Sequence, residues 1–168
     1  MFVPVNAPLT MVADREGGVV LGFVNKEIFY MKFLGHVSSS LGSHCASMLR
    51  TKLSGTPVLG FFCDAEAPGT IDLSARSSIV RAFLDNRRHL ESMTTLVGAP
   101  IVAPTVRAIA TVLDSLAHIA DSAEDFHAML VRAAPYAQAK LPRDKWTRTM
   151  VSEAPRPSTR LRVAPRRP

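Results

Sequence analysis

Apolar residues change their spacing several times along the chain, and each change predicts a secondary-structure element. Two apolar runs at residues 18–24 and 28–38 are rich in β-branched and aromatic side chains and have the length of strands. The short polar segment between them favours a hairpin turn. The second run does not alternate cleanly, which indicates either burial on both faces or a bulge near Gly35.

A helical spacing follows this hairpin. From Leu41 to Leu53 the apolar side chains recur at the three- and four-residue intervals of one helix face. Either Ser39 or Ser40 could cap the start of this helix, and Gly55 could end it.

Strands and helices alternate along the rest of the domain. Apolar runs predict strands at residues 57–65, 92–100 and 117–121. Apolar faces at helical spacing predict helices through residues 79–90 and 106–116, with Pro104 near the start of the second. Ser122 and Asp125 resemble a capping box that opens a last helix to residue 133.

The predicted order is β-β-α-β-α-β-α-β-α, with about five strands and about four helices. Strands that alternate with helices require crossover connections, and these give a mostly parallel sheet. Because the first two strands form a hairpin, one pairing is antiparallel. The sequence therefore predicts an α/β fold with a mixed, mostly parallel sheet.

The charge of the chain is concentrated in its last part. The net charge is +6, but residues 135–168 alone hold nine Lys or Arg and two Asp or Glu. Residues 1–134 are therefore close to neutral and give no general reason to expect a nucleic-acid-binding surface. We predict a lead-in at residues 1–14 with room for one short strand, a folded domain at 15–134, and a basic Pro/Arg-rich tail at 135–168. Most of this tail should be disordered, from Ala154 above all. Trp146 is the one large anchor in it, and the last helix could continue briefly over residues 137–141.

Several classes of protein are not expected. The apolar runs are too short to cross a bilayer, and the first residues lack the pattern of a secretory signal, which favours a cytoplasmic location. Cys45 and Cys63 lie far apart without metal-ligand spacing and fall on apolar faces, so we interpret both as core residues. No clustered acid–base pair is visible. We therefore expect no cofactor, no metal and no enzymatic activity.

One stretch combines polar and small residues where a strand passes into a helix. Residues 63–84 read CDAEAPGTIDLSARSSIVRAFL, with Asp64 at the apparent strand end, Asp72 eight positions later, and Ser74 at the apparent helix start. A serine there lies beside unpaired backbone N–H groups and the positive end of the helix dipole.

This pattern resembles the STAS domain family, which includes anti-sigma-factor antagonists, stressosome subunits and transporter tails. The resemblance covers roughly residues 15–134. A glycine late in the second strand matches FLGHVS, an apolar strand ending in aspartate matches VLGFFCD, and DLSA stands where the family has DSSG. The resemblance implies a STAS-like fold and a regulatory domain that binds other proteins.

The resemblance also implies a site at the start of the second helix. In the family's switch members the second hydroxyl residue after the aspartate is phosphorylated, and by position this is Ser74, with Leu73 and Ala75 replacing a hydroxyl residue and a glycine. The implied partner-binding residues are Asp72, Leu73, Ser74, Ala75, Arg76 and Ser77, with Asp64 as the acid that ends the preceding strand. The alternative is that Ser74 is only an N-cap, and Ser77 or Ser78 takes either role if the helix begins later.

Two functions remain open at this point. The first is an anti-sigma-factor-antagonist-like domain whose partner is an anti-sigma factor, a kinase-like protein or another STAS-like subunit. The alternative is a structural or polarity scaffold, which could form homo-oligomers and use the basic tail as a tether to a partner, a membrane surface or nucleic acid.

Overall fold

The fold begins with an antiparallel ribbon of three strands, β1 (Thr10–Ala13), β2 (Gly17–Phe23) and β3 (Ile28–Val37). The computed structural model describes residues 9–98, 103–137 and 147–150. The turn between β2 and β3 is fixed by Asn25, whose side-chain oxygen accepts from the backbone N–H groups of Glu27 and Ile28. This is the hairpin that the sequence predicts.

Three parallel strands extend the ribbon on one side. β4 (Gly60–Ile71), β5 (Met93–Val97) and β6 (Ala117–Ile119) follow β3 in that order. On the other side β7 (Thr147–Met150) pairs with β1 in parallel. The described sheet therefore has the order β6-β5-β4-β3-β2-β1-β7, and the predicted mixed, mostly parallel architecture is confirmed, with seven strands rather than about five. The two additional strands lie in the predicted lead-in and tail.

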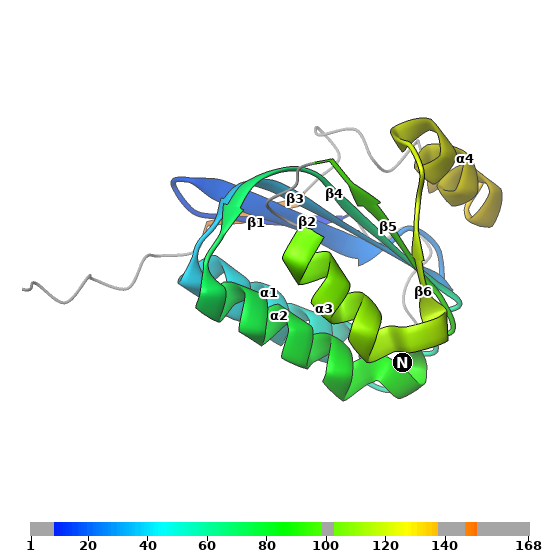
Figure 1. Ribbon diagram of the computed structural model, residues 1–168, viewed down its shortest axis with the longest axis horizontal. Helices are drawn as coiled ribbons and strands as arrows, with labels where there is room; N and C mark the ends of the chain where they lie inside the picture. The colour runs from blue at the N-terminus through cyan, green and yellow to red at the C-terminus, as the bar shows by residue number, and fades with distance from the viewer. Residues whose placement is uncertain (1–8, 99–102, 138–146, 151–168) are drawn as a thin grey trace, which may run out of the picture.

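Helices cover both faces of the sheet (Figure 1). α1 (Ser39–Leu53), α2 (Leu73–Asn86) and α3 (Ala103–Leu113) lie side by side on one face, and α4 (Ala123–Ala133) lies on the other. Short 3-10 helices at Arg87–His89 and Asp114–Leu116 follow α2 and α3. The predicted cap of α4 at Ser122 is confirmed, because the Ser122 hydroxyl accepts from the backbone N–H of Asp125 at 3.0 Å; the Asp125 carboxylate in turn accepts from this hydroxyl, also at 3.0 Å.

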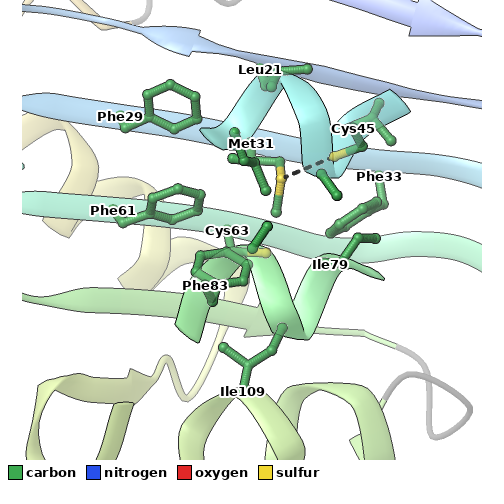
Figure 2. Packing of buried hydrophobic residues seen from close by; sticks show 14 of the residues in the cluster. Leu21, Phe29, Met31, Phe33, Cys45, Phe61, Cys63, Ile79, Phe83 and Ile109 are labelled. Atoms are coloured by element: carbon green, nitrogen blue, oxygen red, sulfur yellow. Dashed lines mark hydrogen bonds between the residues drawn. The ribbon is translucent and has the colours of Figure 1, made fainter. Parts of the chain in front are cut away.

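The main core fills the space between the sheet and the first three helices. Figure 2 shows side chains of β2, β3 and β4 pointing toward those of α1, α2 and α3. Phe61 of β4 stacks on Phe29 at a centroid distance of 5.1 Å and meets Phe83 of α2 edge-on at 5.0 Å. Pairs of this kind each contribute about 1 kcal/mol beyond the area they bury. A second apolar cluster, which includes Phe62 and Phe126, lies beneath α4.

Three local predictions need correction. The helix α1 is capped by Ser38, not by Ser39 or Ser40: its hydroxyl accepts from the backbone N–H of Leu41 at 3.2 Å. The helix α2 ends at Asn86, before Leu90. Finally, β4 runs to Ile71, far beyond the predicted end at residue 65, because β3 is long enough to keep it paired up to Val37.

Two other predictions about α1 and β3 agree with the structure. Gly55 follows the end of α1 with a φ of +70°, a conformation that glycine adopts without strain. The pairing of β3 with β4 shifts register on both sides of Gly35, which is the irregularity expected there. The predictions for Trp146, for residues 138–141 and for the chain from Ala154 lie outside the described residues, as do residues 99–100 of the predicted fourth strand.

Candidate functional site

The candidate site lies where α1 and α2 begin. These helices follow β3 and β4, which are parallel neighbours, and the pairing of the two strands ends at Val37 and Ile71. Both strands therefore end at the same edge of the sheet, and the Asp72 backbone N–H donates to the Val37 carbonyl at 3.0 Å. The first turns of two helices, each with unpaired N–H groups and a positive dipole end, come together at this point.

Asp72 connects the two helix starts. It occupies the N-cap position of α2, but its carboxylate accepts no hydrogen bond from that helix. Its Oδ2 accepts instead from the backbone N–H and the hydroxyl of Ser39, both at 2.9 Å. Asp72 therefore satisfies a donor in the first turn of α1 while standing at the start of α2, and this bond holds the two helices in register.

Ser74 lies in the first turn of α2 and not at its N-cap, so the interpretation of Ser74 as a simple capping residue is wrong. Its side chain is exposed, and its Oγ lies 2.5 Å from the Oγ of Ser39. Ser77 and Ser78 are within the helix and cannot cap it either; the Ser77 hydroxyl donates to the Leu73 carbonyl at 2.9 Å. Ser74 is therefore a hydroxyl group at a helix start that the cap itself does not require.

The residues predicted to bind a partner divide into exposed and buried members. Leu73 is 76% exposed, which leaves it available for contact. Arg76 is partly exposed, and its guanidinium donates to the Pro104 carbonyl at the start of α3 at 3.3 Å. Ala75, by contrast, is fully buried against Gly42 of α1 and cannot contact a partner. The reason is the helical turn, which directs Ala75 toward α1 while its neighbours face solvent.

Asp64 does not belong to this site, and its prediction as the acid at the end of the strand is wrong. It lies inside β4 and is fully buried on the sheet face covered by α4, whereas α1 and α2 cover the other face. Its Oδ2 accepts from Lys32 Nζ at 2.7 Å and from the Tyr30 hydroxyl at 3.2 Å. Burial, with the Asp64 carboxylate as the next cause, raises the pKa of Tyr30 above its ordinary value. This cluster is an ion pair between a partly exposed lysine and a fully buried carboxylate, with a tyrosine as a second donor.

Sequence reasoning missed a histidine beside Asp72. His36 of β3 places its Nε2 3.5 Å from Asp72 Oδ1 and 3.7 Å from Glu16 Oε2. Its Nδ1 lies 2.5 Å from the Thr70 hydroxyl. When protonated, this imidazole is a cation next to the Asp72 carboxylate. The parallel pairing of β3 with β4 was the only signal that could have placed His36 here, and it required the true length of β4.

The two cysteines are core residues, as predicted. Both are buried and unpaired, and the Cys45 thiol points toward the Met31 sulfur at 4.0 Å (Figure 2). Burial raises the pKa of Cys45 to about 12 and also raises that of Cys63, so both stay protonated at neutral pH. Among the described residues no three His, Cys, Asp or Glu side chains form a group that could hold a metal ion.

No helix in the described parts of the chain is both long and apolar enough to cross a membrane.

The comparisons with known proteins concern the fold. No family model matches the sequence, and no curated protein matches it. Among solved structures, the chain is similar to an uncharacterised protein of the DUF3478 family with a SpoIIAA-like fold from Shewanella loihica PV-4, with a TM-score of 0.55 and 13% identity over 70% of this chain and 98% of the other. It is also similar to the anti-sigma factor antagonist SpoIIAA in its unphosphorylated form, with a TM-score of 0.49 and 19% identity over 67% of this chain and 93% of the other. The chain therefore has a SpoIIAA-like fold.

Proposed function

We propose that this chain is a non-enzymatic regulatory domain that binds a partner protein through the surface at the start of α2, and that phosphorylation of Ser74 controls this binding. The observation that carries the proposal is the exposed Ser74 hydroxyl at the meeting point of two helix starts, beside an exposed leucine. A kinase can reach such a hydroxyl, and a partner that binds this surface would contact the added phosphate. The similarity of fold to an anti-sigma factor antagonist agrees with this function.

A phosphate on Ser74 would change the surface strongly. It adds nearly two negative charges (about −1.5 to −2 at neutral pH) where Ser74 now shares a hydrogen bond with Ser39. The positive ends of α1 and α2 favour the phosphate, whereas the Asp72 carboxylate on the same Ser39 repels it. The phosphate would therefore turn away from Asp72 toward solvent, where an approaching partner meets it first.

The first test asks whether the modification exists. The protein is isolated from its own host as wild type, Ser74→Ala and Ser77→Ala, and intact-mass measurement with peptide mapping looks for phosphate. We expect one phosphate on the wild type and on Ser77→Ala, and none on Ser74→Ala. A phosphate that persists in Ser74→Ala would place the switch elsewhere.

The second test asks whether the charge controls binding. A photoreactive amino acid replaces Leu73 in three backgrounds, with Ser74 unchanged, changed to Asn, or changed to Asp. Asn is the uncharged match for Asp, so a difference between these two variants isolates charge from shape. We expect the Asp variant to lose at least about tenfold in cross-linked partner, and the Asn variant to behave like wild type. Equal cross-linking in all three would refute control by charge.

One observation favours the alternative of a scaffold subunit that pairs with a second copy. The strand β6 ends the described sheet, and Ile119 on it is 48% exposed. An open edge with an apolar side chain can add a strand from another chain. Light scattering of wild type and Ile119→Lys tests this; a dimer that the lysine dissociates would support the scaffold, and a monomer in both would exclude this edge. The tether function of the basic tail remains a prediction, because residues 151–168 lie outside the described residues.

A further inference from the structure

One face of α2 presents two exposed leucines to solvent, in a stripe formed by Leu73, Ser77, Val80 and Leu84. These residues follow one another at intervals of four, three and four residues, the spacing of a coiled-coil seam. Within the stripe Ser77 is polar and exposed, and Val80 is partly buried against the core. Leu73 is 76% exposed and Leu84 is 51% exposed. In the described parts of the chain five large apolar side chains are exposed, and two of the five lie on this one face of α2, which distinguishes this surface from the rest.

The stripe forms one side of a groove between α2 and α3. Ala108 of α3 lines the other side, and this small side chain leaves the groove open. The groove is held in shape by two hydrogen bonds to α3, one from α2 and one from the 3-10 helix that follows it. Arg76 donates to the Pro104 carbonyl at 3.3 Å and Arg87 donates to the Val112 carbonyl at 3.0 Å. It is therefore a fixed feature between two connected helices.

The charge along the groove is positive. Arg76 and Arg81 line it, and within the described residues neither forms an ion pair with a carboxylate. The one acidic lining residue, Asp85, is already paired with Arg50 of α1, whose Nε lies 2.9 Å from its Oδ2. A ligand that lies in the groove therefore meets both apolar side chains and guanidinium groups.

We infer that this groove binds an amphipathic α-helix of a partner protein, with leucine-like side chains at seam spacing and acidic residues beside them. This inference rests on the proposed function and names the partner's chemistry. The distance from Leu73 to Leu84 is three helical turns, about 17 Å, so a partner helix of about four turns covers the stripe. A lipid surface fits less well, because a groove between two helices is concave and a bilayer cannot enter it.

Ser74 acquires a defined role in this arrangement. It follows Leu73 at the end of the stripe and is exposed. A phosphate there lies beside the acidic side of the bound helix and repels it, while the unmodified hydroxyl does not. The phosphate therefore acts by charge on the same groove that the leucines occupy.

The experiment uses the full-length chain and two synthetic peptides of about three heptads. Both carry Leu at the seam positions; one has Glu and the other Lys at the flanking positions, and like charges keep each peptide from pairing with itself. Fluorescence anisotropy measures the Kd, and ¹⁵N NMR shifts locate the peptide. We expect the Glu peptide to bind at least about tenfold more tightly than the Lys peptide and to shift resonances of α2 and α3. Equal binding of the two peptides, or shifts centred on α4, would overturn the inference.

Matched variants test which residues of the groove bind the peptide. Leu84→Ser is compared with Leu59→Ser, since Leu59 is 41% exposed but lies outside the groove. Arg81→Glu is compared with Arg132→Glu on the exposed side of α4. We expect the groove variants to weaken the Glu peptide by about tenfold and the controls to change it by less than about twofold. Equal effects of groove and control variants would overturn the inference.

Two further results separate this inference from the proposed function. If Ser74 carries phosphate in its host but the Glu peptide does not bind, the groove inference is wrong and phosphorylation remains. If the Glu peptide binds but Ser74→Asp leaves its Kd unchanged, the groove is supported and control by Ser74 is refuted. A third result would also overturn the inference: the protein binds phosphatidylglycerol vesicles, this binding depends on Leu84 and Arg81, and neither peptide binds. The ligand of the groove would then be a membrane and not a helix.

Discussion

Replacing Gly42 by alanine should destabilise this protein, although alanine favours a helix more than glycine does. Gly42 lies in the first turns of α1, where it faces Ala75 of α2. A Cβ added at Gly42 would lie 2.3 Å from the Ala75 Cβ and 2.5 Å from its Cα, whereas ordinary contacts begin at 3.4 Å. Neither atom can rotate away because both belong to helix backbones or are attached to them directly. The two helices must therefore move apart by roughly 1 Å.

The magnitude follows from two opposing effects. Glycine to alanine in a helix interior gains about 1 kcal/mol from propensity. Overpacking of a close contact costs about 1–3 kcal/mol, and this contact lies at the upper end because the clash involves main-chain atoms. We expect a net loss of about 1–2 kcal/mol in the free energy of unfolding. The shift of α1 should also separate Ser39 from Ser74 and weaken their hydrogen bond.

Urea unfolding followed by circular dichroism measures this loss. The matched control is the double variant Gly42→Ala with Ala75→Gly, which moves the methyl group from one helix to the other. It removes the 2.3 Å contact between the two Cβ atoms and leaves only the 2.5 Å approach to the Cα of residue 75. We expect the double variant to be more stable than the sum of the two single changes by at least about 1 kcal/mol. A Gly42→Ala protein as stable as wild type, or a double variant with purely additive effects, would refute the close contact.

Two other changes test the buried carboxylates. Lys32→Met leaves the fully buried Asp64 without its cation and should cost about 3 kcal/mol of unfolding free energy. The double variant Lys32→Met with Asp64→Leu should recover most of this loss. Additive losses of the two changes in urea denaturation would contradict the pairing of Lys32 with Asp64. For Asp14, burial acts to raise its pKa, but the Ser38 hydroxyl and two backbone N–H groups outweigh it, so the pKa is lowered from 3.8. A carboxyl group whose pKa is lowered by folding stabilises the folded state at pH values above its pKa in the unfolded chain. This stabilisation is lost as the pH falls through its pKa in the folded state. The stability difference between wild type and Asp14→Asn should therefore be largest at neutral pH and shrink below about pH 4, and a difference that does not change with pH would contradict this reasoning.

Periodicity was sufficient to predict the helices and most strands, but not the length of β4. The apolar run predicted a strand only to residue 65, and the segment beyond it holds Pro68, which lacks the N–H that a central strand needs. Among the described residues β4 pairs with β5 only up to Ala65 and continues in its pairing with β3. The described pairing with β5 thus ends before Pro68 is reached. The sequence alone does not show where a neighbouring strand stops.

The sequence indicated where along the chain the candidate site lies, but not which hydrogen bonds form it. A helix start near Ser74 followed from local composition, and the structure places that start at Leu73. The hydrogen bonds of Asp72 to Ser39 join residues 33 positions apart and depend on the register between β3 and β4. Asp64 was assigned to the site by sequence spacing, but alternation along β4 turns its side chain to the opposite face. Spacing along the chain could not predict this difference.

The strand β7, at the end of the described chain, pairs with β1 and so covers one side of that strand. β1 has β2 on one side and β7 on the other, joined over the registers of Thr10 to Thr147 and Ala13 to Met150. A truncation that removes β7 would leave the backbone N–H and C=O groups along one side of β1 without a strand partner. Bare edges of this kind recruit strands from other molecules, which is how many shortened domains come to aggregate. A version of this protein cut before residue 147 would therefore differ from the full chain in its self-association as well as in its charge.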